Sequence, residues 1–101
     1  MVDLRSEVHS RVRGQILRLL SRHHPNLIDV VTLQGSLDTL GYPVPRDDLE
    51  SYMAYLQEVG AVKVETRKFG HMRTRQIVIT VLGLKLVDGR ESDSGVNVEH
   101  D

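Results

Sequence analysis

The chain has 101 residues, 40% of them hydrophobic and 27% charged, with a formal net charge of −1, a profile typical of one soluble domain near the lower size limit for a single core. Cysteine is absent, which excludes a disulfide framework and a thiolate zinc site. No apolar run is long enough to cross a bilayer, and Met1–Arg5 lacks the order of a signal peptide, so we expect a cytoplasmic protein with no membrane partner.

The acidic residues gather at the C-terminal end. From residue 88 onward the chain holds five acids and one base, Arg90, which leaves residues 1–87 with a net charge of +3. Residues 89–95 are small and polar without periodicity, which is typical of disorder. The sequence therefore predicts a folded domain over residues 1–88 and a disordered acidic tail over residues 89–101. Such a tail could shield a basic surface or be a solvated terminus.

Apolar residues at three- and four-residue spacing predict a long amphipathic helix from about Asp3 to Arg22. Its apolar stripe consists of Leu4, Val8, Val12, Ile16, Leu19 and Leu20. Its other face is basic, with Arg5, Arg11, Arg13, Arg18 and Arg22. These arginines either extend a surface that binds phosphate or face water.

Two shorter helices are predicted in the middle of the chain. Either Asp29 or Thr32 could cap the first, which ends near Gly41. Two prolines in the turn 43–45 force the chain to change direction. The second helix is expected from Pro45 to Val59, with Gly60 at its end.

Two β-rich segments follow, over residues 61–66 and 74–80. Both alternate apolar and polar side chains and are rich in β-branched residues, so they predict a hairpin with a loop centred on Gly70. Thr80 is then placed to cap a short last helix, Val81–Asp88, which Gly89 would terminate.

This order of elements resembles the winged helix-turn-helix superfamily over roughly residues 10 to 89. The stretch from Leu49 to Val62 is similar to a recognition helix and its run into the wing. The stretch from Thr80 to Gly89 resembles the element after the wing in small bacterial or prophage-encoded regulators of the arsenic-repressor and multiple-antibiotic-resistance-repressor (ArsR/MarR) kind. The resemblance implies an α+β fold of three helices, a two-stranded β-hairpin wing and a short C-terminal helix, and a role in transcription regulation.

Double-stranded DNA is the partner that this reading implies. The helix before the hairpin would offer Arg46, Ser51 and Tyr55 to DNA. Asp47, Asp48 and Glu50 on the same helix depart from the usual composition of a DNA-reading helix, since carboxylates are repelled by phosphate.

The hairpin carries the densest group of candidate DNA contacts. They are Lys63, Arg67, Lys68, His71, Arg73 and Arg75, opposed only by Glu65. Simple alternation puts Lys63 and Arg67 on one side, matched by Arg73 and Arg75 on the partner strand. Such a ribbon could lie along phosphates or enter a minor groove. Alternatively, its charges could serve only to protect an exposed strand edge.

The resemblance also favours a homodimer, because the first and last helices pair between protomers in many winged-helix proteins. Leu4, Val8 and Val12 would then join the C-terminal helix in the interface, unless Leu4 and Val8 pack on that helix within one chain. His23 and His24 are adjacent and would point apart on a helix, so we expect no metal site. No cofactor, small-molecule ligand or catalytic arrangement is indicated, and we expect no enzyme activity.

The sequence thus predicts a DNA-binding winged-helix protein, most simply a transcriptional regulator that contacts DNA through its third helix and basic wing. The alternative is a winged-helix protein–protein interaction module without specific DNA binding, which would use the acids of the third helix to meet a basic partner.

Overall fold

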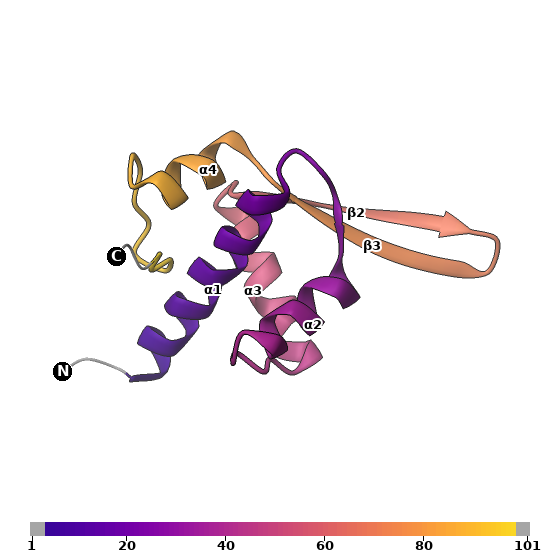
Figure 1. Cartoon of the computed structure of the whole chain (residues 1–101), viewed down its shortest axis with the longest axis horizontal. Coiled ribbons are helices and arrows are strands. Elements are labelled where there is room, and N and C mark those ends of the chain that lie inside the picture. The colour runs from indigo at the N-terminus through magenta and orange to yellow at the C-terminus, as the bar shows by residue number, and fades with distance from the viewer. Residues whose placement is uncertain (1–3, 99–101) are drawn as a thin grey trace.

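Four helices and a three-stranded antiparallel sheet make up residues 4–98, the part of the chain that this computed structural model describes. The elements are α1 (Leu4–His23), β1 (Ile28–Asp29), α2 (Val30–Thr39), α3 (Arg46–Glu58), β2 (Val62–Phe69), β3 (Met72–Ile79) and α4 (Val81–Asp88). The helices gather into one body, from which β2 and β3 extend as a long ribbon (Figure 1). The arrangement confirms the predicted α+β class and fits a winged-helix-like fold. No helix in residues 4–98 is both long and apolar enough to cross a membrane.

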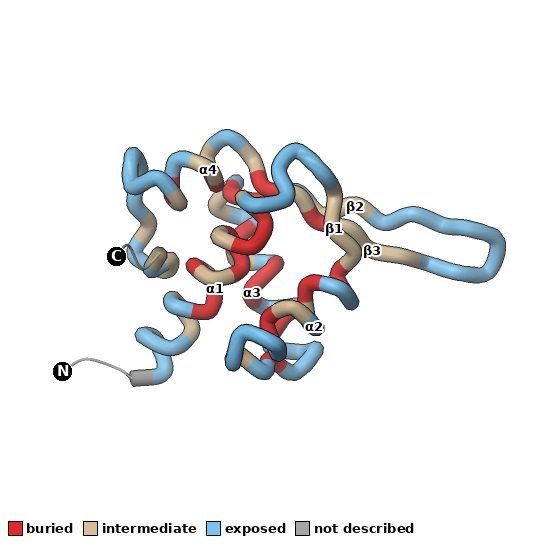
Figure 2. The backbone as a smooth tube through the Cα atoms, viewed as in Figure 1, coloured by how far each residue is buried: buried red, intermediate tan, exposed pale blue. Residues whose placement is uncertain are grey.

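One hydrophobic cluster joins all four helices to the base of the sheet. Its fully buried members include Ile16 and Leu20 of α1, Leu37 of α2 and Leu56 of α3. Ile77 of β3 is also fully buried, which fixes the sheet against the helices. Burial stops partway along the ribbon, and residues 66–73 at its far end are exposed (Figure 2). The core therefore anchors one end of the ribbon and leaves the other end in solvent.

Capping side chains set the starts of α2 and α4. Asp29, rather than Thr32, caps α2, because its side chain accepts a hydrogen bond from the Val31 amide at 2.8 Å. The Thr80 hydroxyl accepts from the Gly83 amide at 3.1 Å and so begins α4 as expected. Gly89, with φ of 78°, ends α4 in the left-handed conformation that glycine adopts without strain.

Strand β1 was not expected from the sequence. It has two residues, and Ile28 pairs with Ile77 while Asp29 pairs with Gln76. A strand of this length is too short to show an alternating pattern, and the cap of α2 follows it at once. It adds a third strand at the base of the ribbon, along the edge of β3 that is not paired with β2.

The hairpin is longer and its turn tighter than predicted. Phe69 pairs with Met72, so the turn consists of two residues, Gly70 and His71. Gly70 has φ of 62°, the conformation that a two-residue type II′ turn requires of its first residue. The basic residues expected in a loop therefore lie on the strands: Arg67 and Lys68 on β2 and Arg73 on β3.

The C-terminal segment differs from the predicted disordered tail over residues 89–98. The Asn97 amide donates to the Ser10 carbonyl oxygen of α1 at 2.9 Å. Arg13 Nη1 donates to the Gly95 carbonyl oxygen at 2.9 Å. Composition suggested disorder because the segment has few apolar residues, but hydrogen bonds to α1 and α3 hold it. We call residues 93–98 the strap; residues 99–101 of the predicted tail lie outside the described part of the chain.

Candidate nucleic-acid interface

The cationic side chains of the ribbon divide between its two faces. Residues paired across an antiparallel sheet share a face, and Arg67 pairs with Thr74 whereas Arg73 pairs with Lys68. Lys63 and Arg67 therefore lie on one face, and Lys68, Arg73 and Arg75 on the other. The predicted match of Lys63 and Arg67 with Arg73 and Arg75 is wrong. A turn of two residues pairs odd positions of β2 with even positions of β3. The odd-numbered cations of β2 and the odd-numbered cations of β3 therefore lie on opposite faces.

We name the two faces by their relation to the core. The inner face carries Val62, Val64, Thr66, Lys68, Arg73, Arg75, Ile77 and Ile79, and the outer face carries Lys63, Glu65, Arg67, Phe69, Met72, Thr74, Gln76 and Val78. The inner face is buried at Val62, Ile77 and Ile79 and becomes basic toward the tip. Five of the candidate side chains are exposed to solvent: Lys63, Arg67, Lys68, His71 and Arg73.

The sixth wing candidate, Arg75, is paired with a carboxylate of α3. Its Nη1 atom donates to both carboxylate oxygens of Glu50. Both side chains are a little over one-third exposed, at 38% and 37%, so the pair contributes at most about 1 kcal/mol to stability. The pair has two larger effects. It ties α3 to the ribbon, and it neutralises the charge of Arg75, which the sequence suggested as a DNA contact.

The solvent face of α3 is acidic. Leu49, Tyr52, Met53 and Leu56 turn the other face into the core. Arg46 and Ser51 are exposed, but so are Asp47, Asp48 and Glu58. Phosphate would meet more carboxylates than cations on this helix, so α3 offers poor electrostatics for a major groove.

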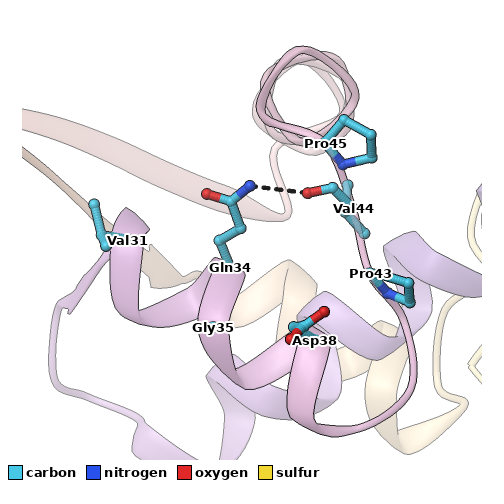
Figure 3. Close-up of a pocket in the computed structure, with 7 residues that line it drawn as sticks. All are labelled: Val31, Gln34, Gly35, Asp38, Pro43, Val44 and Pro45. Atoms are coloured by element: carbon cyan, nitrogen blue, oxygen red, sulfur yellow. Dashed lines mark hydrogen bonds between the residues drawn. The ribbon is translucent and has the colours of Figure 1, made fainter.

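The amide of Gln34 holds the turn between α2 and α3. Its Nε2 atom donates to the Val44 carbonyl oxygen at 2.9 Å (Figure 3). Its Oε1 atom accepts from Arg46 Nε at 3.2 Å, which draws this predicted DNA contact toward α2. A shallow groove of about 510 Å³ lies beside the turn, between α2 and Pro43–Pro45. Asp38 is the only charged side chain among those that line it, so the groove does not suit phosphate.

Tyr55 is engaged inside the chain rather than free for DNA. Its hydroxyl donates to Asp93 Oδ2 of the strap at 2.5 Å. The guanidinium carbon of Arg13 lies 4.1 Å from the centre of its ring, within the range of a cation–π contact. The hydrogen bond to Asp93, followed by burial, raises the pKa of Tyr55. The sequence had placed Arg13 only among the arginines of a basic helix face and had no signal for Asp93.

The proposed dimer residues lie in different surroundings. Val12 is buried in the core of its own chain, and Val8 is 57% exposed; nothing is described of the Leu4 side chain. Helix α4 packs against α1 within one chain. Next to Val8, His9 Nδ1 lies 2.5 Å from the hydroxyl of buried Tyr52. Burial, followed by the charge of Asp48, raises the pKa of this tyrosine. The homodimer stays a prediction.

Comparison with known proteins supports the fold. No protein-family model and no curated protein sequence matches the chain. The crystal structure of TA0346 from Thermoplasma acidophilum, a proposed transcriptional regulator, superposes with a TM-score of 0.63 over 80% of this chain and 79% of that one. The two sequences are 22% identical. The chain is thus similar in fold to this protein, which agrees with the winged-helix-like arrangement of its helices and ribbon.

Proposed function

We propose that this protein is a DNA-binding transcriptional regulator whose wing, rather than α3, supplies most of the contact with DNA. The observation that carries the proposal is the projecting ribbon with its exposed Lys63, Arg67, Lys68 and Arg73. The similar structure, itself a proposed transcriptional regulator, supports the same role. A cytoplasmic homodimer remains part of this proposal.

The balance of charge favours the wing over α3. Strands β2 and β3 hold five Lys and Arg residues and one acid, Glu65. Helix α3 holds one cation, Arg46, and four carboxylates. Each phosphate that a cation neutralises releases counterions and contributes about 0.9 to the slope of log affinity against log salt concentration. The four wing cations not paired with Glu50 therefore predict a slope no steeper than about −4 for one wing.

Titration of the purified protein against a fluorescent duplex of random sequence, at low and at physiological salt, tests the proposal. Anisotropy should rise at low salt and the affinity should fall steeply as salt is added, because the contacts are mainly with phosphates. Absence of binding at low salt would overturn the proposal.

One observation favours a second function. The carboxylates of Asp47, Asp48 and Glu58 are exposed on α3, and such charges suit a basic protein partner better than DNA. The protein would then be a protein–protein interaction module on a winged-helix scaffold. The same titration separates the two functions, since such a module has no need to bind the duplex.

A further inference from the structure

Two large apolar side chains stand at the tip of the ribbon. Phe69 and Met72 are cross-strand partners, directly before the turn Gly70–His71. They are 64% and 67% exposed. They lie four residues beyond the pair Glu65–Gln76, and Gln76 is where Asp29 of β1 pairs with β3. The tip therefore projects about 13 Å past the third strand. Neither side chain belongs to the hydrophobic core.

Cations surround this apolar pair on both faces of the ribbon. Arg67 is the neighbour two positions away on the outer face, and Lys68 and Arg73 form the adjacent pair on the inner face. A ribbon that lay flat along one DNA strand would need its cations on one face. A tip that enters a groove meets a phosphate backbone on each side, and cations on both faces then have a partner.

We propose that the Phe69–Met72 pair is an apolar wedge that enters the minor groove of duplex DNA and partly unstacks one base step. This inference rests on the proposed DNA-binding function and adds to it a mode of site selection. The minor groove is only about 6 Å wide, so a whole ribbon does not fit and only the tip can enter. Gly70 has no side chain, which keeps the tip narrow, and Phe and Met are among the side chains that act as such wedges.

The wedge gives the protein a way to select sites without bases being read by α3. Pyrimidine–purine steps such as TA unstack and kink at the lowest cost. Sites that contain such a step should therefore be preferred, and the bound duplex should be bent away from the wedge. An acidic α3 is compatible with this mode, because selection depends on DNA deformability and not on hydrogen bonds to base edges.

Duplexes with 2-aminopurine in a central TA step test the inference, since the fluorescence of this base rises when it unstacks. The full chain should raise the fluorescence on binding. Phe69→Ala should abolish the rise and weaken binding roughly tenfold, a typical loss for one stacked aromatic side chain, with the salt slope unchanged. Met72→Ala should give a smaller loss. Val81→Ala is the matched control, because Val81 is 68% exposed at the start of α4, at the opposite end of β3 from the tip.

The outcomes separate this inference from the proposed function. If the wild-type protein binds with a steep salt dependence but Phe69→Ala binds equally well and no fluorescence rise occurs, the wedge is refuted and DNA binding stands. If the wild type binds no duplex, both fail. Vesicles of phosphatidylcholine and phosphatidylserine provide the further comparison: loss of vesicle binding in Phe69→Ala without any change toward DNA would assign the tip to lipid and overturn the wedge.

Discussion

Replacement of Gly14 by alanine should release the strap from α1. An added Cβ would lie 2.0 Å from the Asn97 carbonyl oxygen and 2.6 Å from its carbonyl carbon. These are backbone atoms, so no change of rotamer can relieve the overlap. The Asn97 amide also donates to Ser10 on the preceding turn of α1, so the strap must move as a unit. Alanine at position 14 and a docked strap therefore cannot coexist.

The expected effect on stability depends on whether the strap is present. In a helix interior alanine is more favourable than glycine by about 1 kcal/mol. A chain that ends at Gly89 should therefore gain about 1 kcal/mol from Gly14→Ala. In the full chain the same change breaks the three strap hydrogen bonds Asn97–Ser10, Gly95–Arg13 and Asp93–Tyr55. Each contributes about 1 kcal/mol, and the conformational entropy that the released strap regains offsets part of the loss. The full chain should accordingly lose up to about 2 kcal/mol.

Urea unfolding followed by far-ultraviolet circular dichroism measures both values, since the chain has no tryptophan. Amide exchange at Asn97 reports the strap directly and should accelerate in the variant. Gly35→Ala is the matched control: Gly35 lies inside α2 with no atom within 4 Å of an added Cβ, so it should stabilise both chain lengths equally. If Gly14→Ala behaves like this control in the full chain, the docked strap is refuted.

Three further predictions concern the wing and the strap. Arg67→Ala and Arg73→Ala should each weaken binding to all DNA sequences and flatten the salt slope by about one charge; unchanged affinity in both variants would remove the wing from the mechanism. Glu50→Gln should change the unfolding free energy by less than about 1 kcal/mol but steepen the salt slope by freeing Arg75, and an unaltered slope would argue against that release. The raised pKa of Tyr55 contributes stability below its ordinary value of 10.0 that is lost as the pH rises past it. Tyr55→Phe should therefore lose less stability than the wild type between neutral and alkaline pH, as urea midpoints measured across that range would show.

Local signals in the sequence predicted most of the fold. The apolar stripes gave the helices, and Asp29, Thr80 and Gly89 marked boundaries that the structure confirms. Strand β1 could not be predicted, since two residues establish no period. The strap could not be predicted either, because it is held by contacts between residues far apart in the sequence, such as Arg13 and Gly95, which are 82 positions apart.

The candidate site shows a similar division. Composition located the cations of the hairpin, but their division between faces depends on a turn length that composition does not fix. Gly70 was the correct centre, yet only the pairing of Phe69 with Met72 shows the turn to be two residues long. Likewise, Tyr55 has the helical position of a DNA contact, and only the strap shows that its hydroxyl already has a partner.

Mapping of amide chemical shifts during titration with a duplex is the most direct test of wing-centred DNA binding. Wing-centred binding predicts that the largest shift changes occur in residues 63–75, greatest around Arg67 and Arg73, with little change along the exposed face of α3. Changes concentrated at Ser51 and Glu58, with the ribbon unaffected, would contradict it.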